Sequence, residues 1–267
     1  ESSRIYNWAD QRGFVAQPPF FEQGRHSKAP SPLVENAKVL LLLGDGVTTD
    51  DISPAGNIQP RTLAGDYLAQ LGLSNSELHT FGARRGNWQA MLNGAFTNKN
   101  LINHLVSEQR GGVTINHLNQ KIEPVLQVAR QYQAAGIESI ILAGKNYGVG
   151  SSRDDAARST RLLGVRIVIA QSFERIHRSN LCAFSVLPLL FLEGESVETY
   201  RLDGTETFSF DFTKGFPLQG MQVHAKVKRA GQEEFSIALK SALRSEELAY
   251  FLAGGVLPML SKNIIEG

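Results

Sequence analysis

The chain has 267 residues, of which 42% are hydrophobic, so it is long enough to bury a sizeable core and is not of the disordered class. Its 27 basic and 26 acidic residues leave a formal charge of +1, which gives no electrostatic reason to expect binding to nucleic acid or to a membrane. The single cysteine, Cys182, excludes an internal disulfide framework and an iron–sulfur cluster held by this chain alone. No apolar run is long enough for a membrane span, and the polar start is not a signal peptide. We therefore expect a soluble, cytoplasmic protein.

The first 34 residues are rich in proline, glycine and polar side chains, which favour extended and turn conformations. We expect residues 1–34 to form an N-terminal arm or interdomain linker and residues 35–267 to form one folded domain. The chain does not start with methionine, so we also expect it to begin inside a longer protein. The domain should open with the apolar run 37–44, the turn-rich loop 45–56 and a helix over 63–71.

The middle of the chain alternates apolar strands with helices. The expected elements are a helix at 123–135, strands at 138–143, 165–170 and 186–192, and helices at 153–163 and 172–182. This order predicts parallel βαβ units, hence an α/β fold. Alternating patterns at 207–212 and 222–227 predict antiparallel strands, and a last helix is expected near 246–253.

The segment 147–153 is rich in groups that can bind a ligand. Ser151, Ser152 and Arg153 directly follow two glycines, between an expected strand and an expected helix. Such a turn directs backbone N–H groups and the positive end of the helix dipole at an anion, and an arginine adds bidentate recognition of a carboxylate. The two serines and the two acids that follow also fit an ordinary capped helix start. On this segment alone both interpretations stand.

Four motifs, including this segment, lie in register along the chain, at 44–58, 81–87, 146–158 and 172–181. In order and spacing they resemble the C-terminal swivel domain of the aconitase family, in its aconitase A and iron regulatory protein branch. Trp8 and the Pro-Pro-Phe-Phe segment at 18–21 extend the likeness over nearly the whole chain. The resemblance implies a three-layer β/β/α swivel domain with a mixed sheet, of the type found in isopropylmalate isomerase small subunits.

The resemblance also implies an activity. The family removes water from a hydroxy tricarboxylic acid and adds it back at the neighbouring carbon, with a [4Fe–4S] cluster as Lewis acid. By resemblance, Ser151 is the catalytic base, Asp50 belongs to the active-site hydrogen-bond network, and Gly150, Ser152 and Arg153 bind the substrate carboxylates. A serine can act as a base only if nearby N–H groups and a cation stabilise its alkoxide.

The same resemblance places the cluster outside this chain. In the family, the cluster cysteines lie in upstream domains, so the implied partners are those domains of the same polypeptide and a small carboxylate substrate. This chain is expected to hold no metal and to be inactive alone.

Two positions depart from the family pattern. The family's Thr-Thr-Asp-His-Ile-Ser-Pro has Asp51 in place of histidine here, and Leu71 stands where the family carries an arginine before a glycine. These changes suggest a divergent paralogue acting on a citrate analogue such as 2-methylcitrate. Two rivals remain: an apo-form RNA-binding regulatory module, against which the near-neutral charge argues, and a stand-alone small subunit. His177 is expected to be a structural histidine with its hydrogen bonds satisfied.

Overall fold

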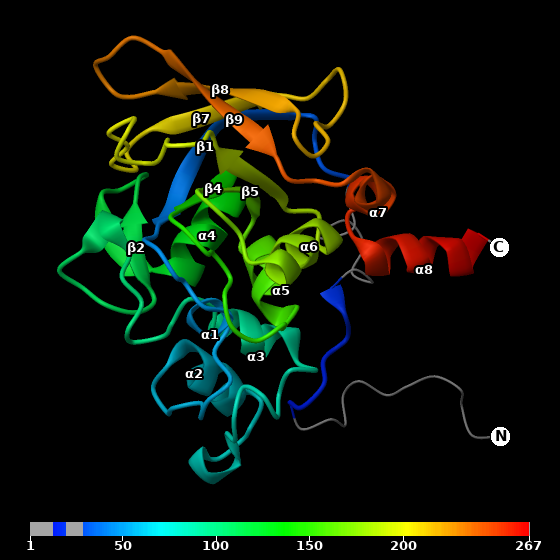
Figure 1. The fold of residues 1–267 in the computed structure, drawn as a ribbon. Coiled ribbons are helices and arrows are strands. Elements are labelled where there is room, and N and C mark those ends of the chain that lie inside the picture. Colours follow the sequence, from blue (N-terminus) through cyan, green and yellow to red (C-terminus); the bar gives the residue numbers. More distant parts are fainter. Residues whose placement is uncertain (1–12, 20–28, 267) are drawn as a thin grey trace.

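The computed structural model describes residues 13–19 and 29–266 (Figure 1). The strands are β1 (Leu33–Leu42), β2 (Val113–Asn116), β3 (Lys121–Pro124), β4 (Ser139–Ala143), β5 (Val165–Ala170), β6 (Leu187–Phe191), β7 (Thr207–Asp211), β8 (Gln222–Lys228) and β9 (Phe235–Ser241). The helices are α1 (Thr49–Ile52), α2 (Leu63–Gln70), α3 (Trp88–Asn93), α4 (Val125–Ala134), α5 (Asp155–Leu162), α6 (Arg175–Ala183), α7 (Leu248–Leu252) and α8 (Val256–Glu266). Short 3-10 helices cover Asn75–Glu77, His104–Val106 and Ser245–Glu247. Trp8, Phe20 and Phe21, which carry part of the family resemblance, lie outside the described residues.

The main sheet closes on itself in the order β1-β4-β5-β6-β9-β8-β7. The strands β1, β4, β5 and β6 pair in parallel, whereas β9, β8 and β7 pair antiparallel and β7 returns to β1. The helices α5 and α6 connect the parallel strands β4, β5 and β6. The predicted parallel βαβ units and antiparallel later strands are therefore confirmed, and closure of the sheet is a feature that the sequence patterns did not reveal.

The parallel strand β4 is covered on both faces. Along β4, Ile140 and Leu142 join the core inside the closed sheet, and Ile141 and Ala143 join a second core against the helices. All five residues of β4 are buried, which explains its continuous apolar run. By contrast, the seven residues of β8 alternate between exposed and buried because its outer face meets solvent.

The two cores define three layers. The antiparallel strands β7, β8 and β9 form one layer, the parallel strands a second, and α4, α5 and α6 cover the outer face of the parallel strands (Figure 1). This is the expected β/β/α arrangement. A third, smaller core joins α2 and α3 through Leu68, Phe81 and Met91, beside the site described below.

The described part of the N-terminal segment, residues 13–19, runs along the segment that leads into α3. The N–H of Ala16 donates to the carbonyl of Gly86 at 3.1 Å, and the indole of Trp88 donates to the carbonyl of Gln17 at 2.8 Å. Within the described residues, no helix has the length and apolar character needed to cross a membrane.

Candidate functional site

Three loops meet where the parallel strands β1, β4 and β5 end. Because the carboxyl ends of parallel strands lie at one edge of a sheet, the loops that follow them are neighbours there. The N–H of Thr49 donates to the carbonyl of Val149 at 2.9 Å, and the N–H of Gly148 donates to that of Val47 at 2.8 Å. On the other side, the N–H of Glu174 donates to the carbonyl of Tyr147 at 2.9 Å. These bonds hold the loop after β4, which carries the predicted site residues, between its two neighbours.

The serines of this loop do not cap α5. The helix begins at Asp155, two residues later than predicted, and its N-cap is Asp154, whose side chain makes no capping bond. Ser151 and Ser152 lie before the helix and are exposed. Neither hydroxyl makes a hydrogen bond to another described residue, so the capping interpretation is wrong for these serines.

The backbone of the same loop offers donors as well. The N–H groups of Gly150, Ser151 and Ser152 donate to no acceptor within the described chain. Gly150 has φ +109°, a conformation that residues with a Cβ rarely adopt. Adjacent N–H groups at the start of a helix attract an anion.

The loop packs on three rings, those of Tyr147, Phe173 and His177. Tyr147 is fully buried, with its ring centroid 6.0 Å from that of Phe173 and 5.3 Å from that of His177. Above them, Gly148 has φ +83°, and a Cβ placed there would lie 2.5 Å from the Cβ of His177 and closer still to its ring. The loop can therefore rest on His177 only because residue 148 is a glycine.

His177 itself is structural, but its hydrogen bonds are not satisfied as expected. Its side chain is 1% exposed, and neither ring nitrogen has a hydrogen-bond partner among the described residues. Burial lowers the pKa of His177 to about 4, with a weaker opposing effect from Glu174. The imidazole is therefore neutral at physiological pH, and its contribution is van der Waals packing in the core.

Arg153 and Asp50 form an ion pair across the site. The guanidinium Nη2 of Arg153 donates to Oδ1 of Asp50, and the two side chains are 24% and 59% exposed. The Nε of Arg153 is buried without a partner in the described part of the chain. The structure thus brings Asp50, in the short helix α1, next to Arg153, 103 residues later in the sequence, on the loop that also carries both serines.

Asp51, the departure from the family pattern, is turned away from this pair. Its Oδ2 accepts hydrogen bonds from the N–H and hydroxyl of Thr48, at 2.8 and 2.7 Å, in a reciprocal capping box at the start of α1. The carboxylate therefore stabilises the short helix that presents Asp50. The other departure, Leu71, ends α2 as a half-exposed side chain beside Gly13.

A second ion pair was missed from the sequence. Arg158 pairs with Asp155 one turn earlier on α5, and its Nη2 also donates to the carbonyl of Arg85 at 2.9 Å. Burial raises the pKa of Asp155, and the charge of Arg158 opposes this shift. The only sequence signal was the three-residue spacing of the acid and the base, which is common on exposed helices. This pair ties the first turn of α5 to the segment before α3.

Comparison with known proteins identifies the family. Residues 64–194 match the model of the aconitase C-terminal domain. Aconitate hydratase A of Streptococcus mutans is 39% identical over 272 aligned residues, covering 100% of this chain and 30% of that protein. The chain belongs to the aconitase family. Phosphinomethylmalate isomerase of Streptomyces viridochromogenes is 37% identical, covering 98% of this chain and 29% of that protein.

The aconitase resemblance drawn from the four motifs is thus confirmed. Among solved structures, a 3-isopropylmalate dehydratase from Methanocaldococcus jannaschii aligns over 86% of this chain and 94% of its own, with 17% identity and a TM-score of 0.46. This chain spans about 30% of the length of the curated aconitase-family relatives that it matches.

The residues of this aconitase-family chain do not fit an iron–sulfur cluster. Such clusters are held by cysteine thiolates, and the one cysteine, Cys182, is fully buried in α6. Burial raises the pKa of the Cys182 thiol, which keeps it protonated. Within the described residues, no three His, Cys, Asp or Glu side chains gather as metal ligands.

Proposed function

We propose that the polypeptide containing this chain is a hydro-lyase of the aconitate hydratase type. It isomerises a hydroxy di- or tricarboxylic acid by dehydration and rehydration, and this chain supplies the base and part of the carboxylate-binding site. The observation that carries the proposal is the loop 150–153, where N–H groups with no acceptor in the described part of the chain, two exposed hydroxyls and an arginine lie together. The aconitate hydratase relative at 39% identity supports the same reaction class.

In this proposal Ser151 takes the proton from the carbon beside a substrate carboxylate, while hydroxide leaves the neighbouring carbon. The alkoxide that must form is unfavourable in water, so it needs an environment that favours negative charge. Support comes from the N–H groups of residues 150–152, the start of α5 and the nearby guanidinium of Arg153. Rehydration reverses the transfer, and Ser151 returns the proton.

Arg153 holds a substrate carboxylate, assisted by Ser152 and the backbone of Gly150. Without substrate, its guanidinium is paired with Asp50, and that carboxylate is 59% exposed. A substrate carboxylate can therefore join the remaining donors of Arg153 while Asp50 fixes the orientation of the fork. Asp50 acts through Arg153 in this chain and extends the site's hydrogen-bond network.

The rest of the machinery lies elsewhere in the polypeptide. We propose that upstream domains hold a [4Fe–4S] cluster, since the one cysteine here is buried in the fold. Residues 1–34 would connect those domains to the swivel domain, 35–267, and this chain alone would be inactive. A single unpaired cysteine suits the reducing cytoplasm, where we place the protein.

A second candidate differs in the substrate. The relatives named aconitate hydratase A and phosphinomethylmalate isomerase are 39% and 37% identical to this chain, so identity alone does not separate citrate from its analogues. Leu71 stands where the family pattern has a cation, which favours a substrate with a different group at that position. A citrate analogue such as 2-methylcitrate is therefore the second candidate.

The test uses the full-length protein, purified without oxygen and supplied with iron and sulfide. Citrate, isocitrate and 2-methylcitrate are offered separately, and the unsaturated acid and the isomer are measured by chromatography. We expect one of them to be converted. Arg153→Gln should raise KM roughly tenfold or more, since a charged hydrogen bond to the carboxylate is lost. Arg130→Gln, an exposed arginine on α4, is the matched control and should leave KM unchanged. If none of the three acids reacts, the proposal fails.

A further inference from the structure

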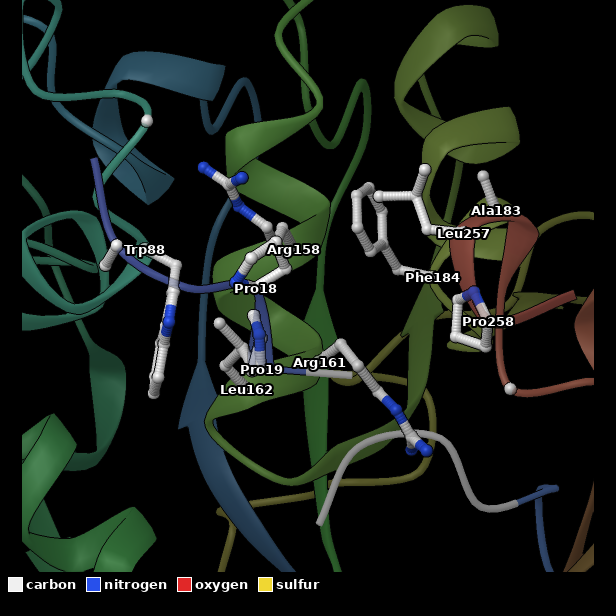
Figure 2. Close-up of a pocket in the computed structure, with 13 residues that line it drawn as sticks. Pro18, Pro19, Trp88, Arg158, Arg161, Leu162, Ala183, Phe184, Leu257 and Pro258 are labelled. Carbon is white, nitrogen blue, oxygen red and sulfur yellow. The ribbon is translucent and has the colours of Figure 1, made fainter. Parts of the chain in front are cut away.

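A separate cavity of about 330 Å³ lies between α5, the end of α6, α8 and residues 16–19 (Figure 2). Its walls are mostly apolar: Pro18, Trp88, Leu162, Phe184, Leu257 and Pro258 line it. In Figure 2 Trp88 lies on one side of α5 and Phe184, Leu257 and Pro258 lie on the other. None of the proposed site residues, Asp50 or 150–153, lines this cavity.

Two arginines interrupt the apolar lining. Arg158 and Arg161 leave the same face of α5 in different directions (Figure 2). Arg158 is already engaged by Asp155 and by the carbonyl of Arg85. Arg161 makes no hydrogen bond or ion pair within the described part of the chain. Of the two arginines that line the cavity, Arg161 is therefore the one without a direct partner among residues 13–19 and 29–266.

Among the described residues, the charge of Arg161 is compensated only in part. The carboxylate whose charge favours the charged form of Arg161 is that of Glu138. It already forms an ion pair with Nη1 of Arg166, at 2.7 Å. Two guanidinium groups thus share one carboxylate. Burial, and then the charge of Arg166, lower the pKa of Arg161 to about 10, so it is still charged at neutral pH. A partly buried charge without a partner is costly and gains from an anion placed beside it.

We propose that this cavity binds a small amphipathic carboxylate, with its apolar body between Trp88, Phe184 and Leu257 and its carboxylate on Arg161. The apolar lining excludes a compact, fully charged acid of the kind turned over at the loop 150–153, because such a ligand would leave most of its charges without partners. A cavity of about 330 Å³ lies at the lower end of the usual range for small-molecule sites, about 300–1,000 Å³, which fits a small ligand.

Because of where the cavity lies, a bound ligand would also stabilise the fold. It would contact residues 16–19, the C-terminal helix α8 and the helix α5, whose first turn follows the candidate active-site loop. A bound carboxylate therefore ties three segments together that are distant in sequence, and it stabilises the folded state in proportion to its concentration.

The test is titration calorimetry of the full-length protein with octanoate. We expect saturable binding of one octanoate per chain and much weaker binding of octanamide, which has the same shape without the charge. Arg161→Gln should weaken octanoate binding roughly tenfold to a hundredfold and leave octanamide unaffected. Arg130→Gln, an exposed arginine on α4, is the matched control and should bind as the unaltered protein does.

A second variant closes the cavity without changing its charge. Ala183→Phe places a ring in the space that Ala183 borders and should abolish binding of both compounds. The melting temperature of each variant is measured alongside, so that unfolding is distinguished from loss of the site. Absence of octanoate binding to the full-length protein, as would follow if another part of the polypeptide fills the cavity, would overturn the proposal. Equal binding of octanoate and octanamide, or unchanged binding by Arg161→Gln, would do the same.

Discussion

Replacing Gly148 with alanine should damage the site through His177. Gly148 has φ +83°, and a Cβ added there would lie 2.5 Å from the Cβ of His177 and closer to its ring carbons. The imidazole cannot move aside easily, because it is 1% exposed and packs against the ring of Tyr147. The new methyl group must therefore displace the loop, the histidine or both.

The loss of stability expected for Gly148→Ala has two parts. An L-residue in the left-handed region costs about 1–2 kcal/mol, and forcing an extra carbon into a packed core costs about 1–3 kcal/mol. Gly148→Ala should thus lower the free energy of unfolding by about 2–5 kcal/mol. Gly46→Ala is the matched control, since Gly46 has φ +67° but no described residue within 4 Å of the added Cβ. It should cost the backbone part only.

Urea unfolding of Gly148→Ala, Gly46→Ala, His177→Ala and the double variant Gly148→Ala/His177→Ala measures both parts. Removing the imidazole relieves the contacts with the ring carbons but keeps the Cβ of residue 177, 2.5 Å from the added carbon. The double variant should therefore recover part of the packing cost of about 1–3 kcal/mol, which appears as a coupling between the two sites. If Gly148→Ala costs no more than Gly46→Ala, or if His177→Ala does not reduce the cost of Gly148→Ala, then residue 148 is not limited by its contact with His177.

Two further predictions concern buried ionisable side chains. The lowered pKa of His177, about 4 against about 6.5 unfolded, means that the unfolded state binds the extra proton between these values. The contribution of His177 to the free energy of unfolding is fully present above about pH 6.5 and is lost as the pH falls. The loss between pH 7 and pH 5 should be about 2 kcal/mol. His177→Phe should lack this component when unfolding is measured at both pH values, and an identical pH dependence would contradict a buried neutral imidazole. Arg178 contacts both oxygens of Glu247 in the core, at 2.5 and 2.8 Å. Arg178→Met should cost about 3–5 kcal/mol in urea unfolding because it leaves that carboxylate buried and unpaired, and Arg178→Met/Glu247→Leu should recover much of the loss. If the double variant is as unstable as Arg178→Met, the loss of stability does not come from the unpaired carboxylate.

The parallel half of the fold could be predicted closely because local signals and tertiary structure agree there. The expected strand at 165–170 is β5 (Val165–Ala170), and the strand expected at 138–143 is β4 (Ser139–Ala143). Strands covered on both faces need continuous apolar runs, and such runs are visible without knowledge of any partner. The glycine that follows α5, Gly164 with φ +81°, marks the end of that helix clearly.

Other parts of the fold depend on information outside the local sequence. Closure of the sheet pairs Leu33 with Asp211, and neither segment carries a mark of its partner. The helix α8 (Val256–Glu266) was not predicted, because Gly254-Gly255 and Pro258 are typical of a loop. Pro258 lies in the first turn of α8, where its missing N–H has no intrahelical acceptor to lose. The hairpin of β2 and β3 was also missed.

The candidate site shows the same division. The sequence placed Ser151, Ser152 and Arg153 between a strand and a helix, which is where they lie. It did not predict that Asp50 would pair with Arg153, because that contact depends on how the loops after β1 and β4 are joined. The assigned roles of Ser151, Ser152, Arg153, Gly150 and Asp50 stay predictions.

The central claim is that Ser151 is the base of a hydro-lyase. The most direct measurement compares kcat of full-length Ser151→Ala with that of the unaltered enzyme, on the acid that the enzyme converts and with equal cluster content in both preparations. Loss of a general base predicts a fall in kcat of roughly 10²–10⁴-fold with little change in KM. Ser76→Ala, at an exposed serine before α3, is the control and should have full activity. A Ser151→Ala enzyme with nearly unchanged kcat would contradict the account.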